Sequence, residues 1–149
     1  MIDMKKIIFC ILLLLMTSTA FGADPKSILG VWKTDRGESQ VEIFMCGNKF
    51  CGKIIWLRNP MRIGNEEIKA PIFDRKNPEP SLRSRPVLGL QILKGFTAEG
   101  ENIWGDGTCY DPKSGNTYKG KIHMTEPDKL ILRGYILIPF FGRNSVWTR

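Results

Sequence analysis

The chain has 149 residues, of which 42% are hydrophobic and 25% charged, and it carries a formal net charge of +7. This is the length of one domain, which can bury a core without many disulfides. The positive excess attracts anions but is too small to identify a nucleic-acid-binding protein, and we expect no nucleic-acid partner.

The first 22 residues have the organisation of a bacterial export signal. Two lysines precede an apolar run of ten residues, 7–16, and the small residues Ala20 and Gly22 then suit a signal peptidase. We predict cleavage near Gly22 and a periplasmic or secreted protein with no transmembrane anchor, because the apolar run is too short to span a bilayer. Residues 23–149 then form a single domain of charge +6, since the signal removes two lysines and one aspartate.

Eight later segments have the alternation, or the β-branched and aromatic enrichment, typical of strands. They are residues 30–33, 41–45, 52–57, 88–96, 103–110, 117–124, 129–137 and 141–148. In the fourth of these, Leu88, Leu90, Ile92 and Phe96 are expected to share one face. Turn residues separate the later strands at 98–100, 111–116 and 126–128.

Evenly spaced strands joined by tight turns indicate a sandwich or a barrel. Gly120, Gly134 and Gly142 lie inside strand patterns, where glycine often marks a bend at a barrel corner. We therefore predict an all-β fold: an antiparallel up-and-down β-barrel of about eight strands. The interior of such a barrel holds side chains or one small ligand.

Two short motifs bracket this barrel, with Gly30 and Trp32 at its start and Trp147 and Arg149 at its end. The guanidinium of Arg149 is expected to stack on the Trp32 indole and to bind nearby carbonyls, which would close one barrel end. Arg143 is the alternative partner for this indole.

Three cysteines follow the export signal. Cys46 and Cys51 flank a four-residue turn between two apolar runs, and in an oxidising compartment we expect a disulfide there. The alternative is a redox or metal pair, but redox and zinc motifs have a spacing of two residues. Cys109 remains as a small buried hydrophobic residue. No metal or other cofactor is expected.

Residues 58–87 interrupt the pattern as a long, proline-containing loop between the third and fourth strands. Such a loop is usually a lid or a binding loop. It carries a net charge of +3, from seven Lys or Arg against four Asp or Glu. We expect an ordered cover that is either a lid or a protein-contact surface.

Six motifs together resemble a family of small exported bacterial lipocalin-like proteins of unknown function. They are Gly30-Val31-Trp32-Lys33-Thr34, Cys51-Gly52-Lys53-Ile54, Asp74-x-x-Asn77-Pro78, Leu82-Arg83-x-Arg85-Pro86, Tyr110-Asp111-Pro112-x-x-Gly115-x-x-Tyr118 and Trp147-Thr148-Arg149. The resemblance implies a lipocalin-like barrel and an exported location. It implies no activity and no catalytic residues.

Candidate ligand-binding residues fall into an aromatic and a polar group. The aromatic group is Trp56, Trp104 and Tyr110, and the polar group is Asp74, Asn77, Arg83 and Arg85. The tryptophans, with Trp147, would line a pocket or fill the core. In the polar group an arginine would bind a carboxylate or phosphate, or Asp74 would pair with an arginine and fasten the loop. We favour fastening, and we interpret Tyr110 mainly as a strand end.

Catalytic signatures are weak. His123 is the only histidine and has no motif partner, and the spacing of Asp106 and Asp111 does not mark an acid–base pair. We therefore expect no enzyme and rank a hydrolase last. The favoured function is a carrier of a small apolar or amphipathic, possibly anionic ligand, which requires a cavity. The alternative is an inhibitor of a protease or cell-wall hydrolase that contacts its target through 58–87 and has a filled barrel.

Overall fold

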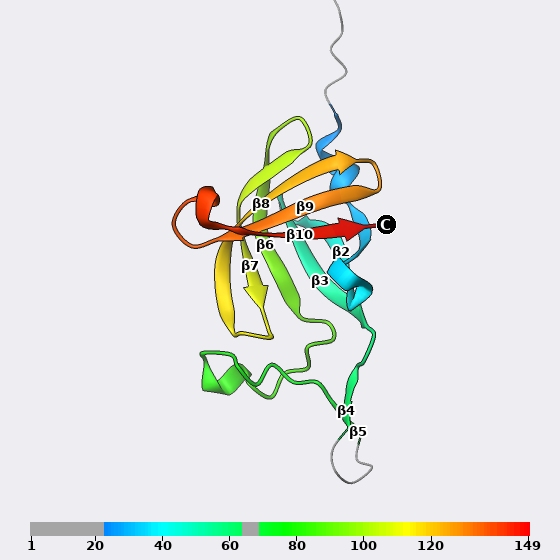
Figure 1. Ribbon diagram of the computed structural model, residues 1–149, viewed down its shortest axis with the longest axis vertical. Coiled ribbons are helices and arrows are strands. Elements are labelled where there is room, and N and C mark those ends of the chain that lie inside the picture. Colours follow the sequence, from blue (N-terminus) through cyan, green and yellow to red (C-terminus); the bar gives the residue numbers. More distant parts are fainter. Residues whose placement is uncertain (1–22, 64–68) are drawn as a thin grey trace, which may run out of the picture.

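The structure, a computed structural model, describes residues 23–63 and 69–149, so the predicted export signal lies outside the described residues. Eight antiparallel strands close into a barrel in the order β1-β10-β9-β8-β7-β6-β3-β2 (Figure 1), which confirms the predicted fold. The strands are β1 Gly30–Lys33, β2 Ser39–Cys46, β3 Lys49–Leu57, β6 Gln91–Gly100, β7 Ile103–Asp111, β8 Asn116–Glu126, β9 Lys129–Tyr135 and β10 Arg143–Thr148.

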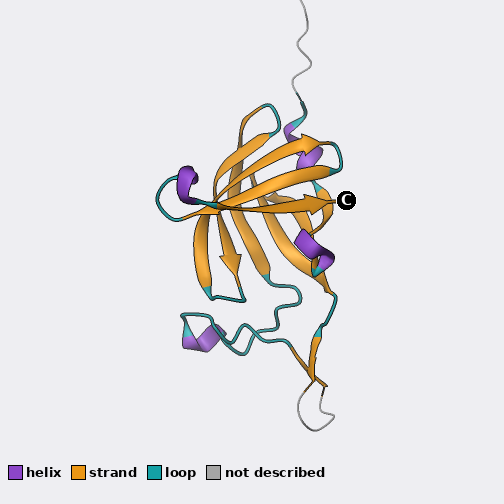
Figure 2. Cartoon of the chain, in the orientation of Figure 1, coloured by secondary structure: helices purple, strands orange, loops and turns teal. Residues whose placement is uncertain are grey.

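Short 3-10 helices lie outside the barrel strands (Figure 2). They are η1 Pro25–Ile28, η2 Asp35–Gly37, η3 Pro80–Leu82 and η4 Pro139–Phe141. Among the described residues, no helix has the length and hydrophobicity needed to cross a membrane.

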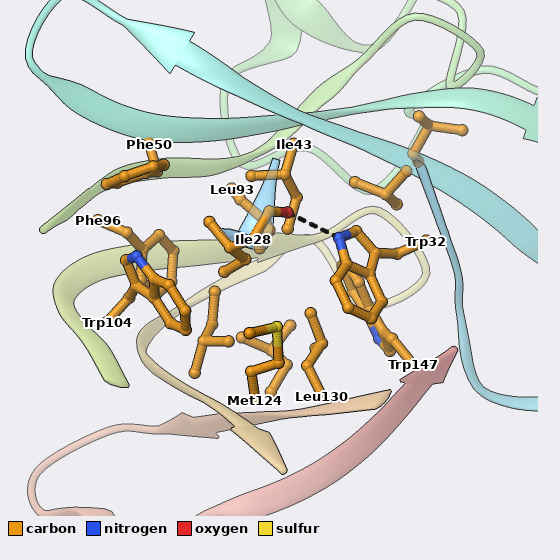
Figure 3. Close-up of a cluster of buried hydrophobic side chains, with 14 of the residues drawn as sticks. Ile28, Trp32, Ile43, Phe50, Leu93, Phe96, Trp104, Met124, Leu130 and Trp147 are labelled. Carbon is orange, nitrogen blue, oxygen red and sulfur yellow. Dashed lines mark hydrogen bonds between the residues drawn. The ribbon is translucent and has the colours of Figure 1, made fainter. Parts of the chain in front are cut away.

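The two ends of the barrel differ. The β2–β3, β6–β7 and β8–β9 turns lie at one end together with η1, which we call the closed end. Trp32 and Trp104 donate their indole N–H groups to the carbonyls of Ile28 and Pro25, at 2.8 and 3.1 Å, so η1 is fixed over the barrel. The side chain of Ile28 is fully buried among core residues (Figure 3). At the opposite, open end, residues 58–63 and 69–87 lie below the strands (Figure 1).

The ring of Phe96 lies against Gly107 and Gly120, which face each other across β7 and β8. A Cβ at either position would lie 2.2 or 2.4 Å from a ring atom, closer than any real contact. These glycines therefore make room for an aromatic core residue. The sequence analysis interpreted Gly120 as a bend at a barrel corner, whereas the structure shows that glycine is needed there to make room for Phe96.

The predicted inward face of residues 88–96 was right only in part. Leu90 and Phe96 are buried and Ile92 is half-buried, but Leu88 is exposed before β6 begins and Leu93, which was not predicted, is buried. The cause is an irregular pairing of β3 with β6, in which Phe50 faces Phe96 but Gly52 faces Leu93. The extra β6 residue, near the positive-φ residue Gly95, shifts the alternation by one position. The strand also continues to Gly100, through the turn predicted at 98–100.

Other boundaries also differ from the prediction. β9 ends at Tyr135 and β10 begins at Arg143, so Ile136, Leu137 and Phe141, which we had assigned to strands, lie in an exposed connection, 136–142. The segment 58–87 is not wholly non-strand, because β4 Met61–Ile63 pairs with β5 Lys69–Pro71 as a separate two-stranded sheet.

Cys46 and Cys51 form the predicted disulfide across the β2–β3 hairpin, with their Cα atoms 5.9 Å apart. Such a bond indicates a protein that folds outside the reducing cytoplasm. Cys109 is free and partly buried in β7.

Candidate functional site

A cavity of about 930 Å³ occupies the open end of the barrel, where it is covered by residues of the segment 58–87. We call the described residues of this segment, 58–63 and 69–87, the cover. Its apolar wall comes from Ile54, Leu93, Leu132 and Trp147, which are buried side chains of four different strands. Ile72 and Val87 of the covering segment complete this wall. A volume of this size is typical of pockets that hold small molecules, about 300–1,000 Å³.

The rim of the cavity is polar and carries more positive than negative charge. Its cations are Arg36, Arg58, Arg75, Lys76 and Lys113, and its carboxylates are Asp35, Glu38 and Asp111. The Lys113 ammonium forms an ion pair with Glu38, and this hydrogen bond and charge lower the pKa of the Glu38 carboxyl. With five cations against three carboxylates, the rim attracts an anionic group.

Asp74 is the most deeply buried charged residue of the cover, with no exposed side-chain surface. Its Oδ1 accepts a hydrogen bond from the Tyr110 hydroxyl at 2.5 Å, and its Oδ2 accepts one from the Asn77 amide at 2.8 Å. The Arg85 guanidinium reaches Oδ2 through Nε at 3.0 Å and Nη2 at 2.9 Å. We call Asp74, Asn77, Arg85 and Tyr110 the clamp, because they join the cover to β7.

The surroundings of Asp74 affect the pKa of Tyr110, and a further hydrogen bond joins Arg83 to the clamp. Burial, and then the hydrogen bond and negative charge of Asp74, raise the pKa of the Tyr110 phenol. Arg83, which is exposed, donates from Nε to the backbone oxygen of Asn77 at 2.8 Å. The polar residues of 74–85 thus bind one another and the barrel, which is the fastening interpretation. Neither Arg83 nor Arg85 lines the cavity.

A second contact holds the cover, and the sequence analysis missed it. Gly115, in the turn between β7 and β8, has φ +79, and a Cβ there would lie 1.9 Å from the backbone oxygen of Lys76. Only glycine fits both this conformation and this approach. The signal was present in the motif Asp111-Pro112-x-x-Gly115, but it reads as an ordinary turn without knowledge of the segment packed against it.

The three tryptophans considered for a pocket lie in three different places, and two of these three do not line the cavity. Trp56 is 43% exposed and lies outside it. Val41 pairs with Ile54 but Gln40 pairs with Trp56, so a bulge at Ile55 turns Trp56 outward. Trp104 is buried near the closed end, against Phe50. Trp147 is buried and forms part of the cavity wall.

The structure brings Trp32 and Arg149 together at the closed end. The guanidinium carbon lies 4.3 Å from the centre of the indole ring. The same guanidinium donates to the carbonyls of Pro127, Leu29 and Ser27 at 2.8, 3.2 and 3.1 Å. Gly30 adjoins it, since a Cβ there would lie 3.8 Å from Nη1. Arg143, the alternative partner, lies exposed at the start of β10.

Cys109 also contributes to the cavity wall. Burial raises the pKa of its thiol to about 12, so the group is protonated at neutral pH. It is therefore an apolar wall residue rather than a reactive thiolate.

The residues considered for catalysis are dispersed. His123 lies exposed on the outside of β8, between Ile103 and Ile131 in the pairing register. Asp106 is exposed in β7 with φ 56, and Asp111 accepts hydrogen bonds within the β7–β8 turn. Within 23–63 and 69–149, no three His, Cys, Asp or Glu residues are grouped to hold a metal ion.

Comparisons with known proteins agree with this architecture. A family model described as "uncharacterized protein conserved in bacteria (DUF2147)" matches residues 30–149. No curated protein matches the chain. A solved structure with the same fold is that of protein HP1028 from Helicobacter pylori, described as belonging to the lipocalin family. It is 23% identical, the match covers 82% of each chain, and the TM-score is 0.69.

Proposed function

The chain belongs to this bacterial family, and we propose that it is an exported carrier of a small amphipathic ligand. The ligand lies in the cavity at the open end, with its apolar part against the barrel wall and an anionic group at the rim. The observation that supports this proposal is the cavity itself, about 930 Å³ between the barrel and a fastened cover. A carrier needs this space, whereas a purely structural barrel would fill it with side chains.

The wall suits an alkyl or ring system. Leu93, Leu132 and Trp147 present hydrophobic side chains from three strands, and Val87 faces them from the cover. Burial of each methylene group contributes about 0.8 kcal/mol to binding. An apolar part of several carbons would therefore offset the cost of immobilising a small ligand.

The rim suits a carboxylate, sulfate or phosphate. Lys113 already pairs with Glu38, and Arg58 donates to the backbone oxygen of Arg36 at 2.8 Å. Arg75 and Lys76 make no ion pair within the described part of the chain. These two exposed cations and the guanidinium groups of Arg36 and Arg58 are the groups that we assign to the ligand's anionic end.

In this proposal the cover keeps the same position over the cavity with and without ligand. The clamp and the contact of Gly115 with Lys76 both tie it to β7 and the following turn. Binding then requires little reorganisation of the protein, which favours affinity.

A second candidate is an exported inhibitor that contacts its target through 58–87. The observation in its favour is that Arg83 is exposed outside the cavity, on a segment held in one shape. An inhibitor has no need for the cavity beneath this segment, so we rank it second.

A titration with cis-parinaric acid, a fluorescent fatty acid, tests the carrier. Leu132→Trp places a large side chain in the cavity, and Val146→Trp is the matched control because Val146 lies exposed on the outside of β10. Circular dichroism and a thermal unfolding curve show whether each variant folds, since overpacking costs about 1–3 kcal/mol. Arg58→Gln combined with Arg36→Gln removes two rim charges without touching the wall.

The carrier predicts one probe per chain, binding lost at least about tenfold in the folded Leu132→Trp variant, and binding retained in Val146→Trp. The rim variant should bind the fatty acid more weakly but retain the corresponding fatty alcohol. Equal binding by all variants, or no binding by the wild type, would overturn the carrier. Capture of a protease or hydrolase that Arg83→Glu abolishes would support the inhibitor in its place.

A further inference from the structure

The connection between β9 and β10 exposes an unusual apolar cluster. Five large side chains of residues 136–141 are between 50% and 79% exposed: Ile136, Leu137, Ile138, Phe140 and Phe141. Pro139 lies between them, so six consecutive residues present no polar side chain. Single exposed hydrophobic residues are common, but a contiguous group of this kind marks an interaction site. The loop and η4 project from the side of the barrel (Figure 1).

Part of the polar backbone of this loop is hydrogen-bonded within the protein. Arg133 donates from Nε to the carbonyl of Pro139 and from Nη2 to that of Phe140, the latter at 3.0 Å. Phe141 donates its N–H to the carbonyl of Ile138 at 3.2 Å, and Pro139 has no N–H. Backbone groups that lack partners are costly in a lipid environment, so this internal bonding suits a loop that enters one.

The surroundings of the loop are positively charged. Arg133 of β9 contacts the loop directly, through the carbonyls of Pro139 and Phe140. Arg143 is exposed where β10 begins, and Lys119 is exposed on β8 opposite Tyr135. Cations beside an exposed apolar loop complement anionic headgroups, and each adjacent Lys or Arg strengthens such binding.

We infer that residues 136–141 dock the protein peripherally on a bilayer that contains anionic lipids. The apolar side chains enter the boundary between headgroups and acyl chains, while Arg143 and Lys119 contact the phosphates. A bilayer fits better than a protein groove as the occupant, because the apolar residues stand on a projecting loop with the exposed cations Arg143 and Lys119 beside it. This inference does not depend on the carrier, since the loop is no part of the cavity wall.

Vesicle flotation tests the docking, with the processed protein recovered from the periplasm and its N-terminus checked by mass. Vesicles of equal parts phosphatidylcholine and phosphatidylglycerol are compared with vesicles of phosphatidylcholine alone. Phe140→Ser with Phe141→Ser removes two of the inserted rings. Val31→Ser with Leu88→Ser is the matched control, because these residues are exposed hydrophobics elsewhere on the surface.

We expect binding to the anionic vesicles that the Phe140/Phe141 double variant weakens at least about tenfold and the control leaves unchanged. Lys119→Gln and Arg143→Gln should each weaken it about fivefold, and added salt should weaken it further. Failure of the wild type to bind either vesicle, or equal binding by the double variant, would overturn the inference. So would a wild-type dimer in sedimentation that the double variant dissociates without any vesicle binding, because a second copy would then be the occupant.

Discussion

The hydroxyl of Tyr110 lies 2.5 Å from Oδ1 of Asp74, although the two residues are 36 positions apart in the chain. Tyr110 belongs to β7 of the barrel, and Asp74 is a fully buried carboxylate of the segment above the cavity. This hydrogen bond joins barrel and cover at one point. Its contribution to stability can be measured by unfolding the protein without added ligand.

Arg85 and Arg83 should differ in their effect on stability. Arg85→Gln removes the cation that bonds to buried Asp74, and we expect a loss of about 2 kcal/mol, less than for a fully isolated charge because Tyr110 and Asn77 still donate to the carboxylate. Arg83→Gln removes one exposed hydrogen bond and should cost about 0.5–1.5 kcal/mol. Urea unfolding measures both, and equal losses would contradict the clamp.

Tyr110→Phe should cost about 1.5–3 kcal/mol, because Asp74 loses a donor to its charged oxygen. The loss should depend on pH. Burial and Asp74 raise the pKa of the folded phenol, so its contribution is complete below the unfolded value of about 10 and falls as the pH rises through the higher folded value. The stability difference between wild type and variant should therefore narrow above pH 10. A constant difference across that range would speak against the hydrogen bond.

The disulfide should contribute modestly. Cys46 and Cys51 are separated by only five positions, so their bond closes a short loop and stabilises by no more than about 2 kcal/mol. The variant Cys46→Ser with Cys51→Ser should keep the barrel and unfold at lower denaturant concentration. Loss of the β-sheet signal in circular dichroism would show that the bond fixes the hairpin register to a greater degree than we predict.

Arg149→Gln should destabilise the closed end. The substitution removes the stack on Trp32 and three hydrogen bonds to carbonyls, and we expect a loss of about 1–3 kcal/mol. Arg143→Gln is the control, because Arg143 is exposed on the same strand and should change stability by less than about 0.5 kcal/mol. If the two variants unfold at the same temperature, the stack of Arg149 on Trp32 does not stabilise the protein.

Cys109 offers a reporter of the cavity. Its thiol has a pKa of about 12 because it is buried, so iodoacetamide should react slowly at pH 8, where an exposed cysteine is alkylated readily. A ligand in the cavity should slow this reaction further, since Cys109 forms part of the wall. Mass spectrometry follows the modification over time. Rapid alkylation of Cys109 in the folded protein, unaffected by the fatty-acid probe, would show that this thiol is not part of the wall of the ligand cavity.

The sequence predicted the barrel because spacing, turns and alternation all indicated the same fold. It failed where one extra residue alters the alternation, at Ile55 for the direction of Trp56 and near Gly95 for Leu93. A bulge depends on the pairing of two strands, which local patterns do not contain. The cavity was equally hidden, because its wall combines side chains from several strands and the cover.

The cover illustrates the same limit in its polar residues. Asp74, Asn77 and Arg85 were recognised as a group from their spacing in the chain. Their common partner in the barrel, Tyr110, was not identified, because it lies far away in sequence. Ile136, Leu137 and Phe141 were taken for strand ends, since hydrophobicity alone does not distinguish a buried strand from an exposed loop.

Native mass spectrometry of the protein purified from its own bacterial cells tests the carrier most directly, with the Leu132→Trp variant prepared in parallel. The account predicts a wild-type mass above that of the denatured chain by one small molecule, and no such excess in the variant. The same bare mass for both proteins, together with no binding of added fatty acid, would contradict the carrier.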